Sequence, residues 1–184
     1  ILVDKQYVDG ELIGYGDIHA AEFVNAGQTH RGFMKKSADG VVAYYDAKGR
    51  SMRKQLLKSP LRYGHVTSRF GTRRHPVLGY TRSHNGIDYG VPTGTPVWSV
   101  GDGRVVKAGW HGGFGKLVEV RYPNGWKAQY AHLSKILVRV GQWVTQKQHI
   151  GHVGTTGMST GPHLHYGLKH HGAYVNPLAQ KFER

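Results

Sequence analysis

The sequence predicts a mainly β protein, in which a small N-terminal β module precedes a larger domain built on an antiparallel β-sheet. It contains 27 glycines and 11 tyrosines but few long stretches of helix-forming residues, a composition that favours short strands joined by tight turns. Turn sequences also separate pairs of β-rich runs in both halves of the chain. At 184 residues the chain can hold one sizeable domain and a smaller companion, and we place their boundary near residue 60, which gives domains of 1–60 and 61–184.

The N-terminal module is predicted from its turns. An Ala-Asp-Gly sequence at 38–40 lies between two β-rich runs and indicates a hairpin, and an Ala-Lys-Gly sequence at 47–49 indicates a second turn. Residues 51–57 are the best short helix candidate, because Ser51 can cap a helix and Pro60 prevents its continuation. We therefore expect a short helical linker between the two domains.

The larger domain contains a second predicted hairpin. Lys116 to Tyr122 and Trp126 to His132 alternate between apolar and polar residues, and a Pro-Asn-Gly turn at 123–125 separates them. This arrangement places His132 at the end of a strand.

The charge balance and the absence of cysteine limit the kinds of site. Lys and Arg number 25 against 11 Asp and Glu, so we expect a strongly positive surface and an anionic partner. Nucleic acid, anionic lipid headgroups and an acidic wall polymer all satisfy that requirement. Because the chain has no cysteine, thiolate nucleophiles and cysteine-based zinc sites are excluded, and any metal must be held by His and carboxylate groups.

The start of the chain lacks the basic and apolar regions of a signal peptide, and no run of about 18 apolar residues occurs anywhere in it. The chain begins with Ile1-Leu2-Val3, an apolar triplet typical of a strand entered partway. We therefore expect a trimmed fragment, from which a signal or membrane anchor can have been lost.

Thirteen histidines is a high count, so spacing decides which of them are candidates for chemistry. His84 and Asp88 lie in a glycine-containing segment that we expect to be one extended strand, where an even separation places both side chains on one face. His163 and His165 are also evenly separated, and the apolar residues at 164 and 166 take the opposite face. Each pair alone is weak support for a metal site, but each strengthens the other.

Catalytic zinc takes about three protein ligands from His and carboxylate groups and leaves a fourth position for water. Any three of the four residues in these pairs satisfy that requirement. The remaining histidine, together with His132, could then transfer protons or donate a hydrogen bond beside the water, whereas a closed structural site would use all four residues. The spacing therefore predicts a metal site without deciding which histidines are its ligands.

Several motifs of the larger domain occur in a fixed order. They are Ser68-Arg69-Phe70-Gly71, His84-x-x-x-Asp88, the run from Gly86 to Val97, Gly101-Asp102-Gly103, Tyr130-Ala131-His132, Gly154-x-x-Gly157 and His163-x-His165. Together they resemble the lysostaphin and LytM type zinc endopeptidases over about residues 61 to 180. The segment Arg73 to Gly79 is similar to the longer, envelope-anchored Gram-negative members, and residues 1–60 resemble, more loosely, the β module that precedes their catalytic domain.

This resemblance implies a catalytic domain of the LytM type in which His84, Asp88 and His165 bind Zn²⁺, while His132 and His163 are catalytic histidines that do not bind the metal. It also implies an endopeptidase that acts on the peptide stems and cross-bridges of bacterial peptidoglycan. In Gram-negative relatives the implied target is the D-alanyl to diaminopimelate bond, and the implied location is the periplasm or outer cell envelope. A basic surface suits such a carboxylate-rich polymer.

Two functions other than a peptidoglycan endopeptidase would also account for part of the sequence. A catalytically inactive wall-binding or amidase-activating protein would share the fold but lack metal ligands, and all five residues are present here. A nucleic-acid-binding module would account for the charge and the aromatic content. However, the sequence has no helix-turn-helix, RNA-recognition or zinc-finger pattern, so we expect no nucleic-acid partner.

Overall fold

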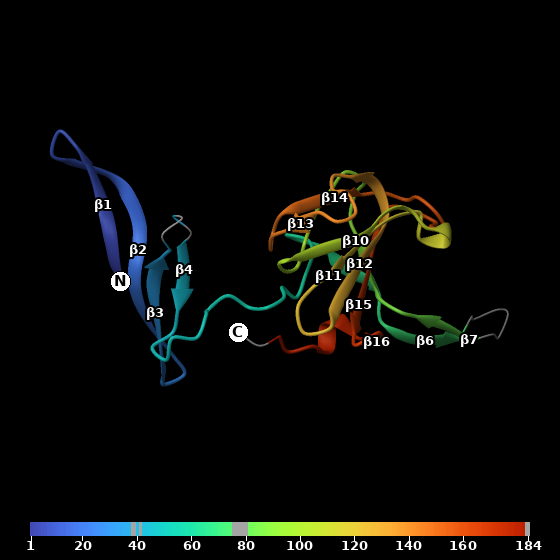
Figure 1. Cartoon of the computed structure of the whole chain (residues 1–184), viewed down its shortest axis with the longest axis horizontal. Coiled ribbons are helices and arrows are strands. Elements are labelled where there is room, and N and C mark those ends of the chain that lie inside the picture. Colours follow the sequence, from blue (N-terminus) through green and yellow to red (C-terminus); the bar gives the residue numbers. More distant parts are fainter. Residues whose placement is uncertain (38–39, 41, 75–80, 183–184) are drawn as a thin grey trace. The chain divides into compact units, whose positions relative to one another are not determined.

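The computed structural model describes residues 1–37, 40, 42–74 and 81–182, which form two compact units (Figure 1). The first unit is Ile1–Gln55 and the second is Leu56–Phe182. The division falls before residue 60 because Leu56 and Leu61 are both buried in the core of the second unit. Residues 38–39 of the first predicted turn and residues 75–79 of the segment that resembles Gram-negative members lie outside the described residues.

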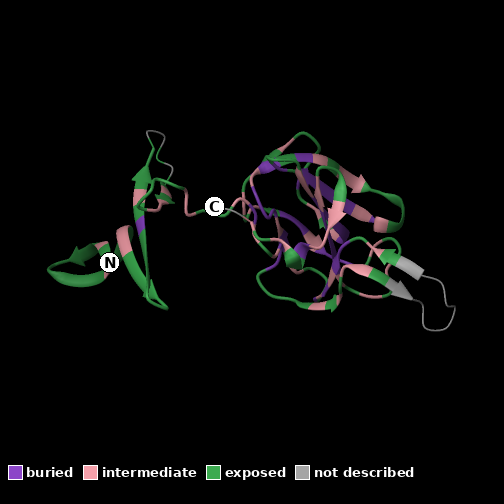
Figure 2. Cartoon of the chain, turned by 90° about the horizontal axis from the view of Figure 1, so that it is seen from below, coloured by how far each residue is buried: buried purple, intermediate pink, exposed green. Residues whose placement is uncertain are grey.

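The first unit is an antiparallel sheet with the strand order β1-β2-β3-β4. Its strands are β1 (Leu2–Val8), β2 (Glu11–Asn25), β3 (Gln28–Lys36) and β4 (Val42–Tyr45). β3 and β4 pair with Phe33 opposite Tyr45, which confirms the predicted hairpin. Among the described residues of this unit only Gly32 is buried, so the sheet has no apolar core of its own (Figure 2).

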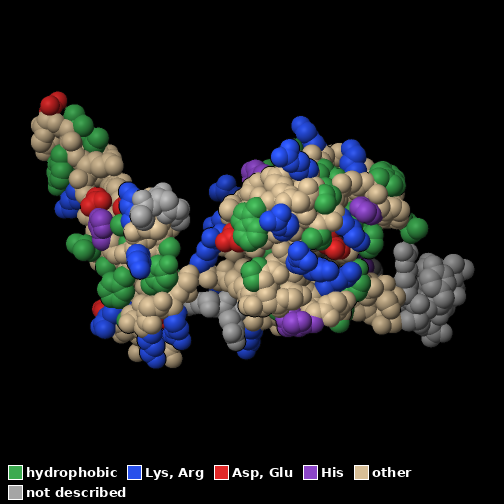
Figure 3. Space-filling view, viewed as in Figure 1, with side chains coloured by type: hydrophobic (Ala, Val, Ile, Leu, Met, Phe, Trp, Pro, Cys, Tyr) green, Lys and Arg blue, Asp and Glu red, His purple; other side chains and the backbone are tan. Residues whose placement is uncertain are grey.

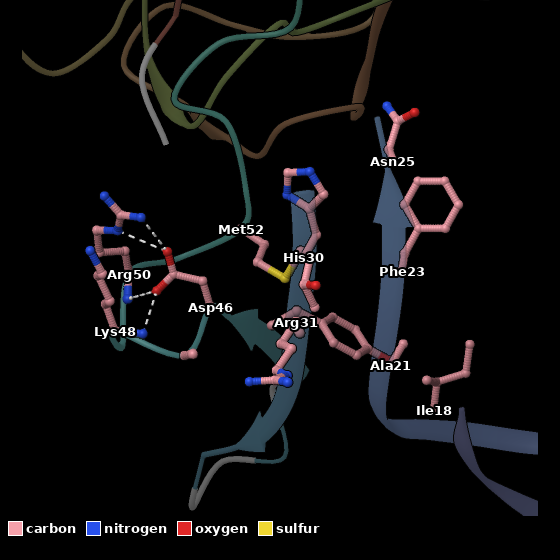
Figure 4. A pocket seen from close by; sticks show the side chains of 14 residues that line it. Ile18, Ala21, Phe23, Asn25, His30, Arg31, Asp46, Lys48, Arg50 and Met52 are labelled. Atoms are coloured by element: carbon pink, nitrogen blue, oxygen red, sulfur yellow. Dashed lines mark hydrogen bonds and ion pairs between the residues drawn. The ribbon is translucent and has the colours of Figure 1, made fainter. Parts of the chain in front are cut away.

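A hollow of about 850 Å³ lies against β2, β3 and the turn after β4 (Figure 4). Phe23 and Met52 are among its apolar lining residues. Met52 covers Gly32 so closely that a Cβ on this glycine would lie 2.7 Å from the Met52 sulfur. Beside the hollow, the Asp46 carboxylate accepts a hydrogen bond from the Arg50 side chain. All of its lining residues belong to the first unit, and none of the residues expected to bind metal or to catalyse is among them.

The predicted helix at 51–57 is wrong, because this segment contains only bends and a bridge to β4. The Met52 N–H donates to the Tyr44 carbonyl, and the Leu57 N–H donates to the Val100 carbonyl. These N–H groups therefore bond to distant parts of the chain instead of to carbonyls one turn earlier. The linker is irregular for that reason.

The second unit contains a larger antiparallel sheet and a separate two-stranded ribbon. Its strands are β5 (His65–Ser68), β6 (Gly71–Arg74), β7 (Thr81–His84), β8 (Ile87–Gly90), β9 (Pro96–Trp98), β10 (Gly103–Trp110), β11 (Lys116–Arg121), β12 (Trp126–Ile136), β13 (Trp143–Val144), β14 (His149–Val153), β15 (Leu164–His170) and β16 (Ala173–Val175). The main path through the sheet is β13-β10-β11-β12-β15-β8-β5. β14 pairs with β12 and β9, β16 pairs with β15, and β6 and β7 form the ribbon.

Among the described residues of the second unit, helical structure is limited to short 3₁₀ turns, which are η1 (Gly112–Phe114) and η2 (Pro177–Ala179). Within the described part of the chain, no helix is long and apolar enough to cross a membrane.

Alternate side chains of the central strands form the core of the second unit. On β15, Leu164, Tyr166 and Leu168 are buried among apolar residues of β10, β11 and β12, which confirms the predicted apolar face. Complete burial of a side chain of this size is worth about 1.5–3 kcal/mol. The alternation therefore determines which residues β15 presents on its other face.

The hairpin of β11 and β12 forms as predicted, and the turn residues Asn124 and Gly125 both have positive φ. The prediction that His132 ends the strand is wrong, because β12 continues to Ile136. His132 lies instead at a β-bulge, where the pairing with β11 shifts register and its own φ is 60°. Bulges redirect side chains, and this one occurs at a residue expected to be catalytic.

Candidate metal centre

His84 and Asp88 lie on either side of a break between two strands, so the expectation that they share one extended strand is wrong. His84 ends β7, and Asp88 lies in β8. Gly86 occupies the break, where a Cβ would lie 2.7 Å from Cε1 of His165 and 2.7 Å from the Tyr166 carbonyl oxygen. Glycine therefore allows the chain to pass this close to β15. The two side chains still converge, with His84 Nε2 at 3.1 Å from Asp88 Oδ1.

The pairing of β8 with β15 brings His165 to the same point. Asp88 and His165 are directly opposite each other in the ladder, so their side chains lie on the same face. His165 Nδ1 lies 2.8 Å from Asp88 Oδ1 and 3.1 Å from His84 Nε2. The three donor atoms thus form a compact triangle, and these residues are the group in the described part of the chain that can hold a metal ion.

This donor set fits zinc. Two imidazole nitrogens and one carboxylate oxygen form a catalytic ligand set, which keeps a fourth position for water. Bonds of about 2.0–2.1 Å in tetrahedral geometry separate ligand atoms by about 3.3 Å, close to the sides of the observed triangle. His84 is also oriented for this role, because its Nδ1 donates to the Arg69 carbonyl over 2.8 Å and its Nε2 faces the other two donors.

Asp88 carries negative charge in this environment. Burial would raise the pKa of its carboxyl group, but the hydrogen bonds from His165 and His84 outweigh burial and hold that pKa well below its ordinary value. A metal site needs its carboxylate ionised, and Asp88 meets that condition across the neutral pH range.

His163 reaches the same site from just before β15. Its Nδ1 donates to the Gly161 carbonyl over 2.9 Å and lies 3.2 Å from the Ser159 hydroxyl. This leaves Nε2 facing the centre, 4.0 Å from Asp88 Oδ1. The histidine therefore stands beside the donor triangle and outside it.

His132 lies next to His163, with their ring centroids 4.6 Å apart. Its Nδ1 donates to the Thr156 carbonyl over 2.8 Å. Burial lowers the pKa of His132 more than the bond to Thr156 raises it, so the ring is neutral at pH 7 with Nε2 as its proton acceptor. The structure thus brings together all five residues that the sequence singled out.

Sequence reasoning missed Thr156, which fixes the carbonyl that His132 contacts. The Thr156 hydroxyl donates to the Leu133 carbonyl over 2.8 Å and accepts from the Lys116 N–H over 3.0 Å. These bonds fasten the loop after β14 to the β11–β12 hairpin. A threonine that acts through its backbone carbonyl has no sequence signal of its own, although the neighbouring glycines mark the loop.

The turn η1 forms one wall of the site. The Phe114 ring centroid lies 5.7 Å from that of His165. The Met158 N–H donates to the Gly113 carbonyl over 2.8 Å, and a Cβ on Gly157 would overlap the backbone of Gly115. The two loops therefore pack backbone against backbone beside the metal centre, and the glycines make this approach possible.

The mainly β fold thus brings two histidines and an aspartate to one point, with two further histidines beside them, which is an arrangement suited to a zinc peptidase. The chain belongs to Peptidase family M23, whose sequence profile matches residues 82–177 and so includes all five of these residues. This match confirms the expected relationship to the lysostaphin and LytM type zinc peptidases.

The similarity to individual relatives covers more of this chain than the family profile does. The chain is 43% identical over 178 residues to the peptidoglycan DD-endopeptidase ShyC of Vibrio cholerae, a match that covers 96% of this chain and 40% of ShyC. A crystal structure of a zinc-containing peptidase from Vibrio cholerae matches with a TM-score of 0.69 and 34% identity, over 98% of this chain and 56% of that one. The catalytic domain of lysostaphin from Staphylococcus simulans matches with a TM-score of 0.57 and 32% identity, over 62% of this chain and 90% of that one. The chain thus spans about two fifths of the length of ShyC.

Proposed function

We propose that this chain is a zinc-dependent endopeptidase that hydrolyses the peptide cross-links of bacterial peptidoglycan, at the bond between D-alanine and diaminopimelate. The convergence of His84, Asp88 and His165 carries the proposal, because catalytic zinc requires such a donor set. The similarity to ShyC, which is named a peptidoglycan DD-endopeptidase, supports the substrate. The proposed location is the periplasm or outer cell envelope, where this polymer lies.

In the proposed mechanism His84, Asp88 and His165 hold the zinc ion, which when bound lowers the pKa of water to about 7 and polarises the scissile carbonyl. His132 is neutral and bonded to Thr156 through Nδ1, so its Nε2 can accept a proton from the attacking water. His163 is bonded to Gly161 through Nδ1, which directs Nε2 toward the reacting groups. There it can donate a hydrogen bond to the developing oxyanion or transfer a proton to the leaving amine.

Digestion of purified sacculi tests this function. The zinc-loaded protein is expected to release soluble muropeptides, and mass spectrometry should find cross-linked dimers converted to monomers at the D-alanyl to diaminopimelate bond. Release of products cut at another bond would contradict the proposed specificity. Zinc-loaded protein that binds sacculi but releases nothing would indicate an inactive wall-binding protein.

Substitutions separate the roles of the five residues. We expect His84→Ala and Asp88→Ala to lose zinc and activity together, because each removes a ligand. His132→Ala is expected to keep zinc and lose about 10²- to 10⁴-fold in rate, which is the usual contribution of a general acid or base. Metal analysis beside the rate measurement distinguishes these classes, and a zinc-free His132→Ala protein would contradict the assignment.

A further inference from the structure

The positive charge of the chain is concentrated in its second unit. Eight of the 25 Lys and Arg residues and seven of the 11 Asp and Glu residues lie in positions 1–55, which leaves 17 basic and four acidic residues for positions 56–184. The formal net charge of +14 therefore belongs almost entirely to the peptidase unit. Figure 3 shows Lys and Arg side chains gathered on this unit over the region where Figure 1 draws β10 and β11.

Four of these basic residues form a row across adjacent strands. Arg104 of β10 is opposite Arg121 of β11, Arg121 is opposite Lys127 of β12, and Lys127 is opposite Lys169 of β15. Directly opposed residues in an antiparallel ladder point to the same face, so the four side chains lie side by side on one face of the sheet. We call this set the cation row.

Like charges directly opposite one another destabilise a sheet. None of the ion pairs among the described residues involves a member of the row. The acidic residues described in this unit have other roles: Asp88 lies in the metal centre, Asp102 accepts a hydrogen bond from the Gln146 N–H, and Glu119 is buried and accepts one from Gln129. The sequence thus maintains a repulsive arrangement that an external anion would relieve.

The cation row shares its face of the sheet with the metal centre. His165 and Lys169 both belong to β15 and are separated by an even number of residues, so both point to this face. At about 3.3 Å per residue, they are about 13 Å apart along the strand. The Lys169 ammonium lies 4.4 Å from the centroid of the Tyr174 ring, and the Tyr174 hydroxyl donates to Gln129 over 2.8 Å. Lys169 is therefore held in place at the end of the row nearest β16.

We propose that the cation row is a substrate-binding subsite, which binds carboxylate groups of the peptidoglycan peptides, with its nearest member, Lys169, about 13 Å along β15 from the metal centre. The inference rests on the proposed function and adds to it a set of residues that contact substrate away from the zinc ion. An extended peptide of about four residues spans that distance, so one cross-linked peptide can reach both places. The chemical group that the row recognises is the carboxylate, and the repeated carboxylates of the wall polymer supply it.

The test compares two triple variants in the zinc-loaded protein. Arg121→Gln, Lys127→Gln and Lys169→Gln together remove three charges of the row. Lys58→Gln, Lys135→Gln and Arg139→Gln together remove three exposed charges elsewhere on the same unit. Binding to purified sacculi is measured by co-sedimentation at several salt concentrations, and the rate of cleavage is measured against the concentration of soluble cross-linked muropeptides. A second arm uses sacculi whose carboxylates have been converted to amides.

We expect the row variant to bind sacculi roughly tenfold more weakly, with a shallower dependence on salt, while the control variant changes little. For the row variant, the muropeptide concentration that gives half the maximal rate should rise by a similar factor, while its maximal rate and its zinc content stay unchanged. Amidated sacculi should bind the wild-type protein as weakly as the row variant does. Equal binding by the two triple variants, or equal binding to native and amidated sacculi, would overturn the proposal.

The readouts also separate this proposal from the proposed function. A wild-type protein that binds sacculi through the row but releases no muropeptides would contradict the peptidase function and leave the row intact as a binding surface. If the triple variant loses zinc or fails to fold, Lys127→Gln alone removes the centre of the row, and Lys135→Gln is its single-site control.

Discussion

The Nδ1–H of His132 donates to the backbone carbonyl of Thr156 over 2.8 Å, and this bond joins a β-bulge to a loop. His132 adopts a left-handed backbone conformation, so its ring points away from the path that a regular strand would give it. The carbonyl of Thr156 then holds the ring in one orientation and in one protonation pattern. The proton acceptor of the proposed mechanism is thus positioned by a residue with no chemistry of its own.

We predict that Thr156→Val lowers turnover roughly tenfold without loss of zinc. The substitution removes the hydroxyl that bonds Lys116 and Leu133, so the loop and its carbonyl lose their attachment to the hairpin. Loss of these bonds should also reduce the free energy of unfolding by about 1–3 kcal/mol. Steady-state kinetics, metal analysis and urea unfolding check these effects together. Thr156→Ser keeps the hydroxyl and should recover most of the activity, and a Ser variant as impaired as the Val variant would refute the role of that group.

A second prediction concerns the left-handed backbone of His132. His132→Asn and His132→Val should both lose most turnover and retain zinc, because neither supplies an imidazole. The Asn variant should nevertheless be the more stable of the two by about 1 kcal/mol or more, since asparagine tolerates positive φ and a β-branched residue does not. Thermal unfolding of the two variants under identical conditions measures the difference. Equal stabilities of the two variants would contradict this prediction, because they would show that the backbone at the bulge adapts to valine without loss of stability.

Gly86 provides a third prediction. Gly86→Ala should weaken zinc binding by about 10- to 100-fold, because its Cβ would displace the His165 ring or the Tyr166 carbonyl from the positions that form the site. Zinc affinity is measured by competition with a chromogenic chelator. Gly161→Ala is the matched control, since nothing lies within 4 Å of a Cβ at that position. Unchanged zinc affinity in Gly86→Ala would mean that β8 can move away from β15 freely.

The fourth prediction concerns pH and the zinc-free protein. Burial lowers the pKa of His132 in the folded state, so the unfolded chain, where histidine titrates near about 6.5, binds a proton first as the pH falls. Neutral His132 therefore contributes to the free energy of unfolding above the unfolded-state pKa of about 6.5. This contribution is lost as the pH falls from that pKa toward the lower pKa of His132 in the folded state. The lowered pKa of Asp88 also reduces the free energy of unfolding as the pH falls, but only at and below the ordinary carboxyl pKa of 3.8.

Urea unfolding of chelator-treated protein between about pH 7.5 and 5 should therefore give a falling free energy of unfolding, with a smaller fall for His132→Asn. Parallel curves for the two proteins would indicate that His132 titrates normally in the fold.

Local sequence patterns predicted the features that depend on neighbouring residues. The Pro-Asn-Gly turn predicted the β11–β12 hairpin because positive φ at Asn124 and Gly125 suits that turn. Alternation predicted the buried face of Leu164 and Tyr166 for an equally local reason. The assignment of His165 to the ligands and of His163 to catalysis came only from the family resemblance and stays a prediction. His165 Nδ1 lies 2.8 Å from Asp88 Oδ1, whereas His163 Nε2 lies 4.0 Å from it.

The errors arose where distant parts of the chain decide the local structure. Residues 51–57 have a capping residue and a terminating proline, yet Leu57 bonds to Val100 and no helix forms. The even spacing of His84 and Asp88 indicated one strand, whereas the close approach of β15 at Gly86 requires a break. The bulge at His132 likewise follows from its pairing with β11, which no short sequence pattern encodes.

Asp88 and His165 are 77 positions apart in the sequence, and the chain has no cysteine. An ion held by both residues closes a loop of that length, as a disulfide would, and restricts the unfolded chain accordingly. With an ion bound, the site would therefore also have a mechanical role, because it would fasten β8, and through β8 the edge strand β5, to β15. Without the ion, amide exchange should become faster first along the β8–β15 ladder.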